Sequence, residues 1–169
     1  YMESFEQDGL NTQSWELSGD ADWGLDLFNS SNGSTSIKSG LIDNNQISEI
    51  SLVMEIVEDG FIKFDKKVSC EDVGSSTGNY YDYLAFYIDG IEQGKWAGEI
   101  AWSQSSFSVS PGEHEFKWAY VKDQGVVEGQ DAVWIDNLIF PPCYGSSNFM
   151  TGDLNNDDIV NILDIIVLV

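Results

Sequence analysis

The stretch from Ile50 to Val68, ISLVMEIVEDGFIKFDKKV, decides the architecture of most of the chain. Every second residue from Ile50 to Ile56 is apolar. After the turn Glu58–Gly60, three apolar residues again share one face of an extended segment: Ile62, Phe64 and Val68. A period of two is the pattern of a half-buried antiparallel strand. The stretch therefore predicts two long strands joined by a turn.

The same alternation runs from residue 3 to residue 140, in about ten short strands separated by turns. Asp89-Gly90, between segments 81–88 and 91–96, is a strong signal for a tight hairpin turn. Further strands are expected at 4–6, 15–17, 23–28, 34–38, 105–109, 114–121 and 131–140. Loops are expected at 71–79, 98–103 and 122–130. This pattern predicts an all-β antiparallel β-sandwich, of jelly-roll type, over residues 1–142.

The charge of the chain limits its partners. Its 169 residues include 7 basic and 29 acidic ones, for a formal net charge of -22. Such a charge excludes a nucleic-acid or anionic-membrane partner and favours a calcium-binding or salt-tolerant extracellular protein. No apolar run is long enough to span a membrane. We therefore expect a secreted or cell-surface protein. The first residues lack the features of a signal peptide, so we expect the chain to begin after processing or at a domain cut.

The last twenty residues contain a second pattern, GDLNNDDIVNILD at 152–164. Its oxygen-bearing side chains have the spacing of a twelve-residue EF-hand calcium loop. The predicted ligands are Asp153, Asn155, Asp157, the Ile159 carbonyl, Asn161 and Asp164. Asp158 replaces the usual Gly at position 6, and Asp164 replaces the usual Glu at position 12.

This loop, with the apolar residues that follow it, resembles one half of a type I dockerin. The resemblance implies a linker at 143–150 and a calcium-binding loop and short helix at 151–169. The helix from Asn161 would be apolar nearly all round, so it must be buried. The second dockerin unit is not present, so we expect a cohesin-like partner, a second copy of the chain or a missing continuation to cover the helix.

A second resemblance covers residues 3–140. Ser4-Phe5-Glu6, the segment 82–90 and the segment 134–140 look like jelly-roll modules of the MAM, concanavalin-like and carbohydrate-binding families. Related jelly rolls often hold a structural calcium where the first and last strands meet, which implies Glu6 and Asp136 as ligands. The alternative is that Asp136 faces solvent or accepts backbone N–H bonds.

Several aromatic residues lie at or near expected loops: Tyr80, Tyr81, Trp96 and Trp102. Exposed aromatic rings stack on the apolar C–H faces of sugars, so these four predict a glycan platform. The alternative for them is core packing. Trp118 and Trp134 lie in mid-strand, and we expect both in the core.

Cys70 and Cys143 match no metal spacing. In a secreted protein they could form a disulfide that clamps the exit linker to a strand end. The alternative is two free thiols.

No catalytic constellation stands out, so no enzyme activity is predicted. His114 is the single histidine, no Gly-x-Ser-x-Gly elbow exists, and acidic residues are too abundant to identify a catalytic pair. The sequence favours a non-catalytic extracellular module that recognises a glycan, with a calcium-binding tail. Two alternatives stay open: a protein-interaction, adhesion or assembly module, with an apolar patch or open strand edge, and a part of a secreted hydrolase, with two facing carboxylates in a cleft.

Overall fold

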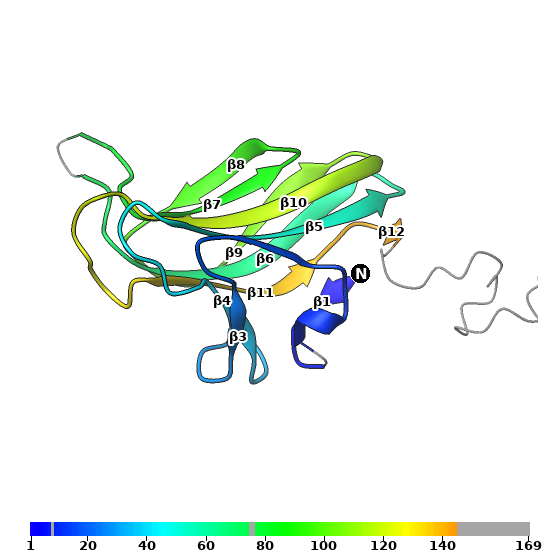
Figure 1. Ribbon diagram of the computed structural model, residues 1–169. Helices are drawn as coiled ribbons and strands as arrows, with labels where there is room; N and C mark the ends of the chain where they lie inside the picture. The colour runs from blue at the N-terminus through cyan, green and yellow to red at the C-terminus, as the bar shows by residue number, and fades with distance from the viewer. Residues whose placement is uncertain (8, 75–76, 145–169) are drawn as a thin grey trace, which may run out of the picture.

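The two alternating segments around the turn Glu58–Gly60 form two long strands, β5 (Ile47–Ile56) and β6 (Gly60–Ser69), in the computed structural model (Figure 1). The structure describes residues 1–7, 9–74 and 77–144. β5 and β6 do not pair with each other, because β5 pairs with β10 and β6 pairs with β9 and β11. The turn between them therefore carries the chain from one sheet to the other.

The strands form two six-stranded sheets in which every pairing is antiparallel. Sheet A has the order β3 (Gly24–Asp26), β4 (Ser36–Lys38), β11 (Ala132–Ile139), β6 and β9 (Glu99–Val109), with β1 (Met2–Glu3) also on β11. Sheet B has the order β12 (Cys143–Tyr144), β5, β10 (Gly112–Val121), β7 (Tyr83–Ile88) and β8 (Ile91–Trp96), with β2 (Glu16–Gly19) also on β5. The described helix is a short 3-10 turn, η1 (Gly9–Asn11). The predicted all-β antiparallel sandwich is confirmed.

The core lies between the two sheets and is rich in aromatic rings. Phe64 of sheet A and Phe86 of sheet B have ring centroids 4.9 Å apart, and the ring of Trp118 lies edge-on to Phe64 at 5.4 Å. All three side chains are fully buried. Burial of each large apolar side chain contributes about 1.5–3 kcal/mol, so this cluster is a main source of stability. The prediction that Trp118 belongs to the core is confirmed.

The hairpin of β7 and β8 has the turn that its sequence predicts. Asp89 has φ 52° and Gly90 has φ 74°. Positive φ at both central residues is the geometry of a type I′ turn, which matches the twist of the flanking strands. Ile88 and Ile91 face each other beside the turn.

Three sequence-based boundaries are wrong. Residues 99–103, expected in a loop, begin strand β9 directly after Gly98, whose φ of 80° completes the turn. The opening strand is Met2–Glu3 and not 4–6, because Phe5 has φ 58° and turns its buried side chain into the core. Cys143 and Tyr144, expected in a linker, pair with Ile56 and Glu55 as β12.

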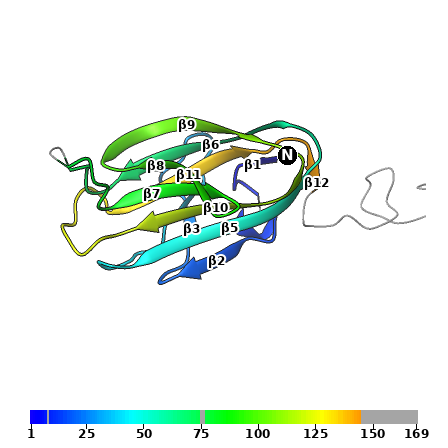
Figure 2. The same ribbon diagram turned by 90° about the horizontal axis from the view of Figure 1, so that it is seen from above.

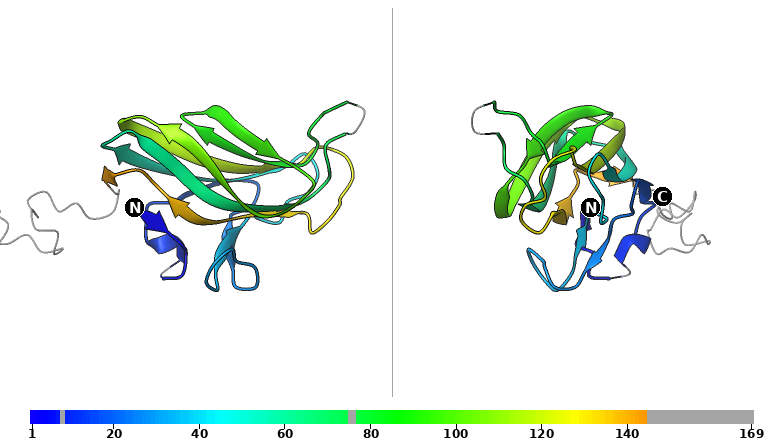
Figure 3. Two further views of the ribbon diagram at one scale, coloured as in Figure 1. Left: turned by 180° about the vertical axis from the view of Figure 1, so that it is seen from behind. Right: turned by 60° about the vertical axis from the view of Figure 1, so that its left-hand side comes forward.

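The outer faces of the two sheets differ. The loop between β3 and β4 covers part of the outer face of sheet A (Figure 3). Under it, Trp134 is fully buried and its Nε1–H donates to Asp26 Oδ2 at 2.7 Å, while Lys67 Nζ lies 4.5 Å from the indole ring. Trp134 is therefore buried as predicted, but beneath a loop and outside the inter-sheet core. In Figure 2, which views the sandwich from above, strands β8, β7, β10, β5 and β2 of sheet B lie side by side.

Candidate functional site

The predicted glycan platform is split between the two sheets. Trp96 ends β8 in sheet B, and Trp102 lies on β9 at the edge of sheet A. Both are half-buried. The ring of Trp96 contacts Phe64 at 6.0 Å and Phe107 at 6.3 Å, so it closes one edge of the core. The structure therefore favours the packing alternative for Trp96.

The tyrosines of the predicted platform lie just before β7. Tyr80 is 41% exposed, and its ring lies edge-on to Tyr83 at 6.1 Å. Lys95 Nζ is 5.6 Å from the ring of Tyr80 and 4.4 Å from the ring of Tyr83. Tyr81 is half-buried, with its hydroxyl 3.4 Å from Thr77 Oγ1. Tyr80 is thus part of an aromatic group that the sequence only partly indicated.

That group continues along the outer face of β7. Leu84, Phe86 and Ile88 point into the core, so the alternate residues Tyr83, Ala85 and Tyr87 lie on the outer side of β7, where Tyr83 also packs against the edge of the core. Tyr83 and Tyr87 are half-buried, and they lie about 13 Å apart along the strand. Ala85 faces Ala119 of β10, and both alanines have 0% exposure. Neighbouring side chains therefore cover both alanines, and the half-buried rings of Tyr83 and Tyr87 form the outer surface here.

Two lysines and two glutamates border this surface. Lys117 Nζ lies 5.3 Å from the ring of Tyr87 and 3.1 Å from Glu49 Oε1. Lys95 Nζ lies 2.9 Å from Glu92 Oε2. We define the tyrosine face as Tyr80, Tyr83, Tyr87, Ala85, Ala119, Lys95 and Lys117.

The tyrosine face is nearly neutral, although the whole chain is strongly acidic. Its two lysines are each paired with a glutamate. Burial raises the pKa of the Tyr87 phenol, and the neighbouring Tyr83 and Glu92 raise it further. Tyr87 therefore keeps its proton and can donate a hydrogen bond at any physiological pH. Such a face suits an uncharged, hydroxyl-rich ligand better than a charged one.

Tyr83 and Tyr87 could not be identified as surface residues from the sequence, because β7 is apolar or aromatic on both faces. In Tyr83-Leu-Ala-Phe-Tyr-Ile88, alternation does not show which side faces solvent. The one usable signal was alternation: Tyr83, Ala85 and Tyr87 alternate with Leu84 and Phe86, so the two sets must lie on opposite faces of the strand.

Glu6 and Asp136, the ligands that the jelly-roll resemblance implied, both bind the loop between β3 and β4. Glu6 accepts hydrogen bonds from the N–H groups of Ser34 and Thr35 and from the Ser34 hydroxyl, at 2.8–2.9 Å. These bonds lower the pKa of Glu6. Calcium at Glu6 and Asp136 stays a prediction, and the contacts of both carboxylates favour the hydrogen-bonded alternative.

Asp136 is fully buried and well supplied with donors. Its Oδ2 accepts from the N–H groups of Ser31 at 2.8 Å and Asn32 at 3.3 Å, and its Oδ1 accepts from the N–H of Asn137 at 2.7 Å. Burial nevertheless raises its pKa. The side chain anchors the covering loop to the centre of sheet A.

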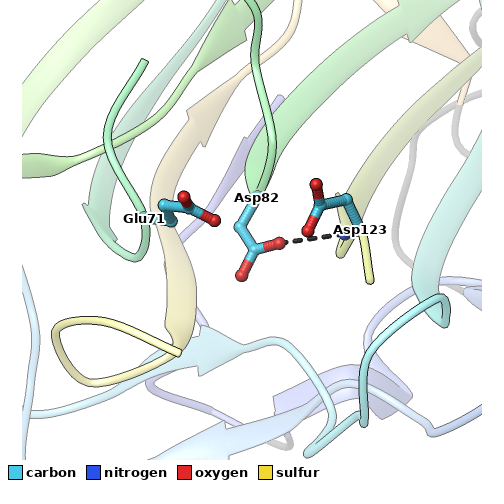
Figure 4. A group of neighbouring side chains, drawn as sticks. All are labelled: Glu71, Asp82 and Asp123. Carbon is cyan, nitrogen blue, oxygen red and sulfur yellow. Dashed lines mark hydrogen bonds between the residues drawn. The ribbon is translucent and has the colours of Figure 1, made fainter. Parts of the chain in front are cut away.

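A different group of carboxylates lies at the end of the sandwich where loops 70–82 and 122–131 emerge (Figure 1). Among the described residues, one oxygen each from Glu71, Asp82 and Asp123 lie within 4.8 Å of one another (Figure 4). Asp82 is 1% exposed, and the other two are half-buried. We call Glu71, Asp82 and Asp123 the acidic end cluster. The sequence did not reveal it, because its members are separated by long stretches of chain.

The predicted disulfide between Cys70 and Cys143 is not formed, and both cysteines are free. Cys70 directly follows the last residue of β6. Cys143 pairs with Ile56, the last residue of β5, which lies just before the turn that leads into the first residue of β6. A ten-residue strand is about 30 Å long, and a disulfide requires Cα atoms within about 7 Å. The fold therefore separates the two thiols.

Both ring nitrogens of His114 form hydrogen bonds to neighbouring turns. Its Nδ1 lies 2.6 Å from Asp89 Oδ2, and its Nε2 lies 3.0 Å from the Ser110 carbonyl oxygen.

The predicted calcium loop at 153–164 and its helix lie outside the described residues. Within the described ranges, no helix is long and apolar enough to cross a bilayer.

Comparison with known proteins finds similar solved structures but no significantly similar sequences. No protein-family model matches the sequence, and no curated protein sequence matches it significantly. The K1 cleaved adhesin domain of Lys-gingipain from Porphyromonas gingivalis W83 aligns with TM-score 0.59 and 10% identity, over 82% of this chain and 95% of that chain. TmCBM61, solved in complex with β-1,4-galactotriose, aligns with TM-score 0.54 and 15% identity, over 84% of this chain and 94% of that chain.

A third similar structure is the secreted serine protease VesC from Vibrio cholerae, with TM-score 0.51 and 14% identity. The match covers 72% of this chain and 24% of VesC, so the chain corresponds to only part of that protein. At these identities the similarity establishes a shared β-sandwich fold.

Proposed function

We propose that the chain is a non-catalytic, extracellular module of jelly-roll type that binds a neutral glycan on the tyrosine face. The observation that carries this proposal is the pair Tyr83 and Tyr87, two half-buried tyrosines on the outer side of β7. Ala85 and Ala119 are fully covered, so a sugar ring would stack on the exposed parts of the two tyrosine rings. A tyrosine combines an apolar ring with a polar hydroxyl, as a sugar surface requires.

The border of the face supplies the polar contacts. Glu49 and Glu92 offer acceptors, and Lys95, Lys117 and the tyrosine hydroxyls offer donors. A few well-placed polar groups around an apolar floor fix the orientation of a ligand. The structural neighbour TmCBM61, whose structure contains β-1,4-galactotriose, supports an uncharged oligosaccharide as the ligand class.

The tail belongs to the same proposal. The loop at 153–164 binds calcium, and the apolar helix after it docks to a cohesin-like partner or to a second copy of the chain. Calorimetry on the full chain should show one calcium-binding event that Asp153→Ala with Asp157→Ala removes. Undiminished total binding in that double variant would contradict the assignment.

The glycan site is tested by affinity electrophoresis and calorimetry of the full chain against neutral and acidic polysaccharides. Binding of a neutral polysaccharide, without release of products, is expected. Tyr83→Ala and Tyr87→Ala should each weaken it at least about tenfold, which is about 1.4 kcal/mol. The matched control is Phe61→Ala, because Phe61 is an aromatic residue with 55% exposure on sheet A. Binding that survives both tyrosine substitutions would contradict the proposal.

Adhesion to a protein is the second candidate function. Leu27 and Phe28 are 65% and 94% exposed in the loop between β3 and β4. The N–H of Phe28 donates to Asp26 Oδ1 at 2.8 Å, so an ordered turn presents the ring to solvent. The structural similarity to a cleaved adhesin domain also supports this candidate. Phe28→Ser would then abolish association with a protein partner and leave glycan binding unchanged.

A further inference from the structure

We infer that the acidic end cluster, Glu71, Asp82 and Asp123, is a binding site for a calcium ion that joins the ends of the two sheets. It is separate from the tail loop and from the tyrosine face. The inference rests on the placement of the three carboxylates and on oxygens that have no hydrogen-bond donor.

The three carboxylates come from three different elements. Glu71 follows the end of β6 in sheet A, Asp82 immediately precedes β7 in sheet B, and Asp123 follows the end of β10 in sheet B. Figure 4 shows their side chains gathered at one point, with one oxygen of each within 4.8 Å of the others. An ion held there would join segments that are distant in the sequence.

Asp82 supplies the second, independent observation. Its residue is 1% exposed, and its Oδ1 accepts the N–H of Asp123 at 3.0 Å. Its Oδ2 is buried, and no group in the described part of the chain donates a hydrogen bond to it. Glu71 Oε2 is likewise buried and receives no hydrogen bond from the described part of the chain. A buried carboxylate oxygen without a donor is costly, and a cation bound by these carboxylates would reduce that cost.

The neighbouring ammonium group does not neutralise the cluster. Lys122 Nζ is bonded to Asp131 Oδ2, and the Tyr120 hydroxyl donates to the other oxygen of Asp131 at 2.6 Å. Burial, together with the charges of Asp131 and Asp123, raises the pKa of Asp82 despite the opposing influence of Lys122. The site is therefore short of positive charge.

The donor atoms select a hard cation. Carboxylate oxygens suit calcium and magnesium, whereas zinc prefers nitrogen and sulfur ligands. The neighbouring thiol of Cys70 is directed at the carbonyl oxygen of Asp82 at 3.3 Å, and burial raises its pKa to about 12. Cys70 therefore stays a neutral thiol and does not become a ligand. Calcium accepts an irregular set of carboxylates and water, whereas magnesium requires near-octahedral geometry, so calcium fits these loop ends better.

The test separates this site from the tail. The full chain carrying Asp153→Ala and Asp157→Ala serves as the parent, and calcium chloride is the titrant. Calorimetry should show a calcium site in the parent that Asp82→Asn weakens at least tenfold. Asparagine keeps an oxygen for the N–H of Asp123 and removes only the charge. Asp59→Asn, which changes an exposed acidic residue, is the control and should leave binding unchanged.

Thermal unfolding provides the second readout. Calcium should raise the Tm of the parent more than magnesium does, and should leave the Tm of the Asp82→Asn variant unchanged. In EDTA the variant should melt at or above the temperature of the parent. Glu71→Gln gives the same comparison if Asp82→Asn does not fold. A parent that binds no calcium, or an affinity that neither substitution reduces, would overturn the inference, and equal shifts with magnesium would overturn the choice of ion.

Discussion

Asp136 and Asp82 are both buried carboxylates of one sandwich, yet their surroundings are opposite. Asp136 receives three backbone N–H groups, from Ser31, Asn32 and Asn137. Asp82 receives one, from Asp123, and its second oxygen is buried with no donor among the described residues, in a side chain that lies beside two other carboxylates. Burial alone therefore does not indicate a metal site. The number of donors that reach the carboxylate distinguishes a structural anchor from a candidate cation ligand.

The largest effect is expected from removing the anchor. Asp136→Ala leaves three N–H groups without their acceptor, two in the covering loop and that of Asn137 in β11, and hydrogen bonds to charged groups contribute about 1.5–3 kcal/mol each. We expect a loss of about 3 kcal/mol or more in the free energy of unfolding, measured by urea denaturation. The loss should be the same in calcium and in EDTA, and Asp136→Asn should lose less because it keeps one acceptor. A loss that appears only in calcium would mean that Asp136 is itself a ligand.

A smaller effect is expected from pH in the absence of calcium. Burial raises the pKa of Asp82 above its ordinary value near about 4. A carboxyl with a raised folded-state pKa contributes stability that is present at low pH and lost as pH rises through that pKa. In EDTA the contribution of Asp82 to the Tm should therefore increase as the pH falls from 7 toward the ordinary carboxyl pKa, and Asp82→Asn should remove that increase.

Saturating calcium should also suppress the increase, because calcium competes with the proton for Asp82. Comparing each variant with its parent cancels the general effect of the negative net charge. An identical pH dependence in the parent and in Asp82→Asn would contradict the distinction between the two carboxylates.

Glu6 should show the opposite sign, with a smaller effect. Hydrogen bonds from Ser34 and Thr35 lower its pKa, so its contribution is present above the ordinary carboxyl pKa and is lost as pH falls below it. Glu6→Gln should lower the Tm slightly at pH 7 and flatten the acid limb of the curve. Glu113→Gln, an exposed glutamate on β10, is the matched control. A steeper acid limb in Glu6→Gln would show that Glu6 does not hold the loop in this way.

The smallest effect concerns the cysteines. Because the fold separates Cys70 from Cys143, a reducing agent should not change the Tm of the native chain. A thiol reagent should label the half-buried Cys143 before Cys70, since burial raises the pKa of Cys70 to about 12. A Tm that falls on reduction would show that a disulfide contributes to stability.

Local patterns predicted the sandwich because strand periodicity, the Asp89-Gly90 turn and the central Trp118 each act over a few residues. Pairing between strands is not local. The segment 50–68 has the pattern of two adjacent strands, yet its turn crosses between sheets. Tyr83 and Tyr87 could not be placed because both faces of β7 are apolar or aromatic.

The acidic end cluster was missed for a related reason. Glu71, Asp82 and Asp123 meet only when β6, β7 and β10 end at the same edge of the sandwich. In a chain with 29 acidic residues, their sequence positions give no sign of that meeting.

A crystal structure of the full chain grown in calcium chloride would test the contrast between Asp82 and Asp136 most directly. We predict an ion bound to Glu71, Asp82 and Asp123, while Asp136 keeps the N–H bonds from Ser31 and Asn32. An ion at Asp136 in place of those bonds, with none at Asp82, would contradict this account.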